Sequence, residues 1–176
     1  YLFKGVEIHW VCDPSLLKEN DKVPPTATLH YPAGLVDYLK DQIEELTCAT
    51  EEPFAGEATF PNKQGRVEWA VAWPQEDYAS DENGWISSFC NTIPTPQGGT
   101  HENGFRQALT RALKDYGERI ANRRAGQLTS EDVSGAAYVI LSCFIHQPQF
   151  QGQTKEKLAS VQAARLVENT VKDHFD

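Results

Sequence analysis

The sequence predicts an α+β domain in which a mixed β-sheet is covered by helices in two layers. Segments with the two-residue alternation of strands lie beside segments with the 3.6-residue repeat of helices. The helical segments are apolar on one side only, and strands and helices do not alternate as regularly as in a parallel α/β fold. The 176 residues, 40% of them hydrophobic, suffice for one buried core. We therefore expect a single domain over residues 1–176.

The first part of the chain predicts two paired strands and a helix. Gly5–Cys12 and Thr26–Tyr31 have strand character and are separated by a polar loop, so we expect them to pair. A break at Pro32-Ala33-Gly34 follows. Apolar residues then recur at helical spacing from Leu35 to Leu46, with acidic residues between them facing water.

The central part predicts the body of the sheet. Pro53–Phe60 and Arg66–Trp73 form a hairpin around a turn that contains Gly65, and the tryptophans of the second strand face the core. An acidic turn region covers residues 75–84. A further strand is expected over Trp85–Ile93.

The last part predicts most of the helices. Thr100 is a candidate N-cap for a helix that runs to about Arg123. Thr129 or Ser130 caps a short helix, and Ala136–Ile145 is a buried strand. A final helical pattern begins near Glu156 and ends near His174.

A polar loop after the buried strand is the first candidate site. In the stretch from Gln149 to Leu158, the sequence Gln153-Thr154-Lys155 follows a glycine and can expose an amide, a hydroxyl and an ammonium group together. An ammonium supplies a point charge and the other two groups supply directional hydrogen bonds, a combination suited to a phosphate. The alternative is a solvated turn.

A second motif gives the loop a context. Three segments together resemble the transducer domain of the ATPase subunit of bacterial type II DNA topoisomerases. They are Gly98-Gly99-Thr100-His101, Gly104-Phe105-Arg106, and the loop with its Pro148-Gln149-Phe150 entry. The segments Tyr31–Leu39 and Asn91–Thr95 fit as well, and they favour the topoisomerase IV B branch over gyrase B. The resemblance covers essentially the whole chain.

The resemblance implies a fold like the second domain of a small-subunit ribosomal protein, with a left-handed βαβ crossover, although the general rule favours the right hand. It also implies an ATPase domain before residue 1 and DNA-cleavage domains after residue 176. The absence of Met agrees with a fragment, which we expect to be inactive alone. In the whole enzyme the domain would couple ATP hydrolysis to DNA strand passage and decatenation in the bacterial cytoplasm, in association with the nucleoid.

The resemblance also assigns roles to three residues. Lys155 would reach the γ-phosphate of ATP and stabilise it during hydrolysis, Gln153 would contact the same phosphate, and Arg106 would face double-stranded DNA. ATP with Mg²⁺ would be bound mainly by the preceding ATPase domain. Two B subunits would form a heterotetramer with the A subunits of topoisomerase IV. We expect the Gln151–Lys157 loop to be mobile without nucleotide, and the helix after it to transmit its movement.

The residues themselves leave other classes of function open. No phosphate loop, metal cluster or membrane span is recognisable, so we expect no metal or membrane partner. The net charge is −9, but residues 1–100 carry −10 and residues 101–176 carry +1, so any DNA contact belongs to the second half. A protein-interaction module that uses the acidic half is the alternative from another class. His101 beside Glu102 suggests acid–base chemistry, but a capping or hinge role is favoured.

Overall fold

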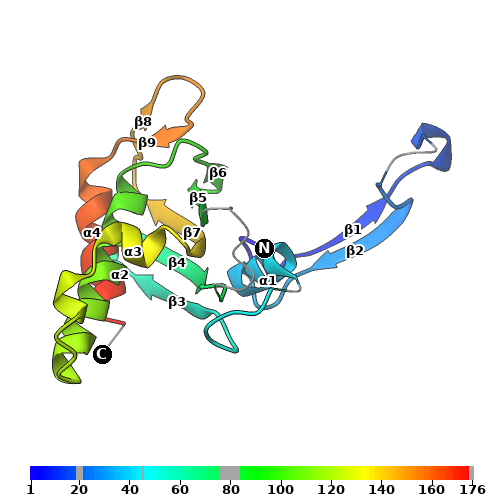
Figure 1. The fold of residues 1–176 in the computed structure, drawn as a ribbon. Helices are drawn as coiled ribbons and strands as arrows, with labels where there is room; N and C mark the ends of the chain where they lie inside the picture. Colours follow the sequence, from blue (N-terminus) through cyan, green and yellow to red (C-terminus); the bar gives the residue numbers. More distant parts are fainter. Residues whose placement is uncertain (19–21, 45, 76–83, 175–176) are drawn as a thin grey trace.

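A computed structural model describes residues 1–18, 22–44, 46–75 and 84–174. Its first element is a two-stranded antiparallel arm, formed by β1 (Glu7–Val11) and β2 (Thr26–His30), which extends away from the rest of the molecule (Figure 1). The predicted pairing is confirmed, and a short 3₁₀ helix (Pro14–Leu16) lies in the connection. The arm leaves Ile8, Trp10 and Val11 between 43% and 77% exposed.

The body of the protein is a five-stranded sheet in the order β3-β4-β7-β5-β6. Its strands are β3 (Phe54–Thr59), β4 (Gly65–Ala72), β7 (Tyr138–Ile145), β5 (Trp85–Cys90) and β6 (Ile93–Pro94). β4 pairs antiparallel with β3 and β7, β6 pairs antiparallel with β5, and β5 runs parallel to β7. The expected mixed sheet is therefore confirmed. Most of the predicted acidic turn, residues 76–83, lies outside the described residues.

Helices cover both faces of the sheet. On one face lie α2 (Thr100–Arg119), α3 (Ser130–Ser134) and α4 (Val161–Lys172), with the main core beneath them. On the other face α1 (Leu35–Ile43) buries Leu35 and Leu39 against Ala70, Ala72 and Ile140. This second core adds a partial third layer, so the predicted two layers are too few. The chain passes through β6, α2 and α3 between the parallel strands β5 and β7, so a crossover is present, and its left hand stays a prediction.

Two predicted helix starts differ in outcome. The side chain of Thr129 accepts a hydrogen bond from the Asp132 amide in a capping box, which confirms Thr129 as the N-cap of α3. Thr100 is not an N-cap: it lies inside α2, and its hydroxyl donates to the Ser160 carbonyl at 2.7 Å. Gly99 precedes the helix and contributes no side-chain cap.

The last helix also starts later than predicted. α4 begins at Val161 and not near Glu156, because Lys157–Leu158 forms a short strand, β9, instead. α2 also ends at Arg119, somewhat before the predicted end, and a 3₁₀ turn (Ala125–Gln127) follows. Another 3₁₀ turn (Pro61–Lys63) joins β3 to β4.

Candidate functional site

The Gln-Thr-Lys loop is the tip of a small hairpin. β8 (Phe150–Gln151) pairs antiparallel with β9, and residues 152–156 connect the two strands (Figure 1). Gly152 and Lys155 both have left-handed backbone conformations, with φ of 75° and 57°. A glycine adopts this region freely, but a lysine does so at a cost, and such strained residues concentrate at functional sites.

The tip presents its polar groups to solvent. Gln153, Thr154 and Lys155 are all exposed, and among the described residues none hydrogen-bonds to their side chains. The structure thus brings together the two residues predicted to bind phosphate, Gln153 and Lys155. An unpaired ammonium beside an amide and a hydroxyl can receive a phosphate that another part of a protein presents.

The base of the hairpin is fastened to the second sequence motif. The Leu158 amide donates to the Gly98 carbonyl at 3.0 Å, and the Gln97 amide donates to the Glu156 carbonyl at 3.0 Å. The Gln97 side chain also donates to the Glu156 carboxylate at 2.6 Å. We call residues 97–99 the hairpin seat. The two motifs that the resemblance paired are therefore in direct contact.

A glycine at position 99 makes this contact possible. A Cβ placed on Gly99 would lie 2.4 Å from the Leu158 carbonyl oxygen and 2.6 Å from its nitrogen. The φ of Gly99 is 147°, which also disfavours a side chain. The backbone of β9 can approach the start of α2 this closely only because no side chain intervenes.

A buried polar cluster lies beneath the seat. Ser88 on β5 has its Oγ 2.6 Å from Thr95 Oγ1 and donates to Glu102 Oε1, also at 2.6 Å. Thr95 Oγ1 lies 3.2 Å from His101 Nε2. The sequence did not predict this cluster. Its only signal is polar residues at Ser88 and Thr95 among apolar neighbours.

His101 is a structural member of this cluster. Its ring is fully buried, and burial lowers its pKa from 6.5 to about 4, so the imidazole is neutral near pH 7. Nδ1 has no hydrogen-bond partner among the described residues. The Glu102 carboxylate bonds to Ser88 and not to His101, so the acid–base pair suggested by the adjacent residues does not form. The favoured non-catalytic role therefore fits better.

Arg106 lies one turn further along α2. Its Nη1 donates to Ser134 Oγ on α3 at 3.0 Å, and its Nη2 lies 3.9 Å from Glu102 Oε2. The side chain is 34% exposed, so part of the guanidinium remains accessible. Glu102 therefore lies between the Arg106 side chain and the hairpin seat.

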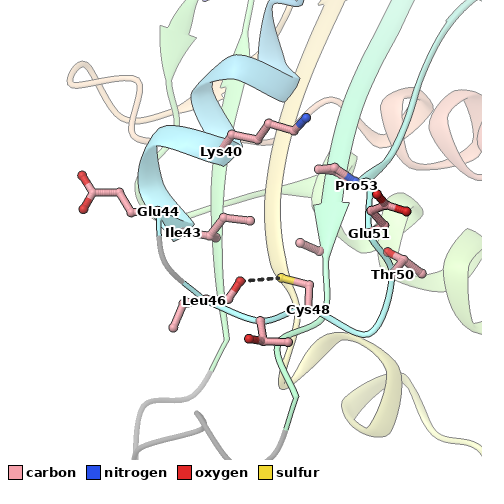
Figure 2. Close-up of a pocket in the computed structure, with 10 residues that line it drawn as sticks. Lys40, Ile43, Glu44, Leu46, Cys48, Thr50, Glu51 and Pro53 are labelled. Carbon is pink, nitrogen blue, oxygen red and sulfur yellow. Dashed lines mark hydrogen bonds between the residues drawn. The ribbon is translucent and has the colours of Figure 1, made fainter.

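A separate cavity of about 380 Å³ lies between the end of α1 and the turn into β3 (Figure 2). The Cys48 thiol faces it and donates to the Leu46 carbonyl, and burial raises the pKa of this thiol. Lys40, at its rim, is paired with Glu52 at 2.6 Å. A protonated thiol and a paired lysine do not form a reactive site.

The part of the chain that the structure describes contains no group of three or more acidic, histidine or cysteine side chains arranged to hold a metal ion. Nor does any described helix combine the length and apolar character needed to cross a membrane.

Fold and site together define a mixed α+β domain that carries an exposed hairpin, with Lys155 at its tip and its base fastened to the residues just before a long helix. The chain belongs to the DNA gyrase B family, whose model matches residues 34–176. It is 48% identical over 176 residues to the B subunit of DNA topoisomerase 4 from Caulobacter vibrioides, and 44% identical to that from Rickettsia felis. The match covers the whole chain but 25% and 26% of those relatives, so the chain spans about a quarter of their length.

Solved structures agree with this assignment. The 43K ATPase domain of Thermus thermophilus gyrase B, solved with an aminocoumarin, superimposes with a TM-score of 0.76 and 25% identity, over 99% of this chain and 43% of that one. The topoisomerase IV ATP-binding domain of Francisella tularensis, solved with a small-molecule inhibitor, gives 0.71 and 29%, over 98% and 42%. The family resemblance predicted from the motifs is confirmed.

Proposed function

We propose that this chain is the part of a topoisomerase IV B subunit that senses the terminal phosphate of ATP and couples ATP hydrolysis to DNA strand passage and decatenation. The main support for this proposal is the hairpin. Lys155 and Gln153 are exposed at its tip, while its base is hydrogen-bonded to the hairpin seat just before α2. The names of the relatives and the ATPase regions among the similar structures support this function. A gyrase B origin is the close alternative.

The tip fits a triphosphate chemically. Lys155 would hold the terminal phosphate by charge, and Gln153 would orient it by hydrogen bonding. Bound with Mg²⁺ mainly by another domain, ATP supplies the phosphoanhydride bond whose hydrolysis drives the cycle. The role of Lys155 is to stabilise negative charge that develops on the terminal phosphate, and to register whether that phosphate is present.

We further propose that the domain has the transducer fold with a left-handed crossover, placed between an ATPase domain and DNA-cleavage domains. The exposed apolar residues of the β1–β2 arm support a contact with a neighbouring domain, since large exposed apolar side chains that lie together mark interaction surfaces. The family model matches from residue 34 onward, so the arm lies outside the matched region and the sheet lies within it. In the assembled enzyme, two B subunits would pair with the A subunits around double-stranded DNA in the bacterial cytoplasm.

Arg106 is the proposed DNA contact. Its partly exposed guanidinium and loose pairing with Glu102 suit it to exchange partners with a DNA phosphate. Arg106→Gln in the intact enzyme should reduce the stimulation of ATP hydrolysis by DNA and leave hydrolysis without DNA nearly intact. Equal loss of both activities would indicate damaged folding instead.

The test of Lys155 uses the whole heterotetramer, with intact B subunits in complex with the A subunits. A charge-assisted contact contributes about 1.5–3 kcal/mol, so Lys155→Ala should slow ATP hydrolysis roughly 10- to 100-fold and impair decatenation. Lys157→Ala is the matched control, because Lys157 is an exposed lysine on the same hairpin but lies at its base. Wild-type hydrolysis and decatenation by Lys155→Ala would refute the proposal.

A further inference from the structure

The Glu102 carboxylate lies where the hairpin seat and Arg106 meet. Its side chain is 13% exposed, one oxygen accepts from Ser88 at 2.6 Å, and the other lies 3.9 Å from the Arg106 guanidinium. The carboxylate also packs against the seat: a Cβ on Gly98 would lie 2.8 Å from Glu102 Oε2. The carboxylate therefore lies directly against the backbone of Gly98.

Hydrogen bonds continue from Ser88 to the hairpin. Ser88 Oγ contacts Thr95 Oγ1, and the Thr95 carbonyl accepts from the Gly98 amide at 2.8 Å. The Gly98 carbonyl in turn accepts from the Leu158 amide of β9 at 3.0 Å. An unbroken series of contacts thus leads from Arg106 through Glu102 to the base of the hairpin that carries Lys155.

The charge on Glu102 fixes the direction of these hydrogen bonds. Ser88 has one hydroxyl proton, and an ionised carboxylate can only accept it, so Ser88 Oγ can act only as an acceptor toward Thr95, whose hydroxyl also donates to the Ser88 carbonyl at 3.0 Å. A neutral group at position 102 could donate instead, and Ser88 would then turn its proton toward Thr95. Burial raises the pKa of Glu102, while the hydrogen bond from Ser88 and the charge of Arg106 lower it.

We infer that Glu102 is a positioning residue that links DNA contact at Arg106 to the hairpin seat. The inference rests on the proposed function for its two ends, the DNA contact of Arg106 and the phosphate contact of Lys155. A pair at 3.9 Å is loose, so a DNA phosphate can take the guanidinium in exchange. The carboxylate then loses its cation, and the hydrogen bonds from Ser88 and Thr95 to the seat rearrange.

The test measures amide hydrogen exchange in the whole heterotetramer of B and A subunits, with and without a DNA duplex. In the wild type, DNA should change exchange of the Gly98 and Leu158 amides about fivefold or more, the lower range of typical coupling between sites. In Glu102→Gln this response should be lost, because a neutral amide no longer pairs with Arg106. Glu168→Gln is the matched control and should keep the response, because Glu168 on α4 pairs with Arg111, which lies further along α2 than Arg106.

Every result of this exchange experiment either supports or overturns the proposed role of Glu102. An unchanged response in Glu102→Gln, or no response in the wild type, overturns it. If Glu102→Gln does not fold, Ser88→Ala takes its place: it removes the hydrogen bonds of Ser88 to Glu102 and Thr95 but leaves the carboxylate against Gly98, so the response should shrink, and a response of full size overturns the inference. Lys155→Ala should keep the response, since the series of contacts ends at the hairpin base. If the Lys155 proposal is wrong, Lys155→Ala will hydrolyse ATP at the wild-type rate. The exchange results would still test the role of Glu102.

Discussion

The buried histidine makes stability depend on pH in a way that can be worked out from the structure. The pKa of His101 is lowered from 6.5 to about 4 in the folded state by burial. As pH falls below 6.5, His101 becomes protonated in the unfolded chain but stays neutral in the folded chain, so the folded state loses stability. The gap of about 2.5 between the two pKa values, at about 1.4 kcal/mol for each pKa unit, predicts a loss of roughly 3 kcal/mol by pH 4.

Glu102 opposes this trend, so the wild type alone does not isolate it. The pKa of Glu102 is raised by burial, and the folded state therefore takes up its proton first as pH falls, which favours folding at low pH. A comparison with His101→Gln separates the two effects. The glutamine amide does not titrate but can still donate to Thr95, so the variant should lose about 3 kcal/mol less than the wild type between pH 7 and pH 4.

The assay is urea unfolding of the 176-residue chain at several pH values from 7 to 4. Any constant cost of the smaller side chain shifts the whole curve and leaves its slope against pH unchanged. His146→Gln is the control, because it removes an exposed histidine and keeps the buried one. Parallel curves for the wild type and His101→Gln would refute the reasoning.

Two further predictions concern the seat and a helix cap. Gly99→Ala should cost about 1–3 kcal/mol of folding free energy and speed exchange of the Leu158 amide, since its backbone conformation and the contact with Leu158 both exclude a side chain. Gly126→Ala, with nothing within 4 Å of the added carbon, should be nearly neutral, and equal costs would contradict the role of the close contact. Thr129→Ala should cost about 1 kcal/mol through loss of its cap, whereas Ser130→Ala, one position later, should not; urea unfolding measures both.

The sheet shows how far alternation predicts burial. In β4 the residues Val67, Trp69 and Val71 were expected to face a core, and they do. Their neighbours Ala70 and Ala72 are buried as well, beneath α1 on the other face. Alanine is common on both buried and exposed surfaces, so its position in an alternating strand does not reveal a second helical layer. That layer depends on where the chain places α1.

The start of α4 was mispredicted because a tertiary contact outweighs a local pattern. Leu158 fits the apolar spacing of the helix that follows, so periodicity alone extends the helix back toward Glu156. The Leu158 amide instead donates to the Gly98 carbonyl, far away in the sequence. The buried cluster of Ser88, Thr95 and His101 escaped prediction for the same reason, since polar residues in a strand normally indicate an exposed face.

The strength of the seat determines how the hairpin can move. Three hydrogen bonds join the hairpin to the seat, two between backbone groups and one from the Gln97 side chain to Glu156, and a fourth joins Thr100 of α2 to the Ser160 carbonyl just before α4. At about 0.5–1.5 kcal/mol each, they contribute roughly 2–6 kcal/mol together, and the middle of this range is about twice that of one phosphate contact, about 1.5–3 kcal/mol. A phosphate at Lys155 is therefore too weak to detach the hairpin. We expect it to move the hairpin, the seat and the beginnings of α2 and α4 as one unit.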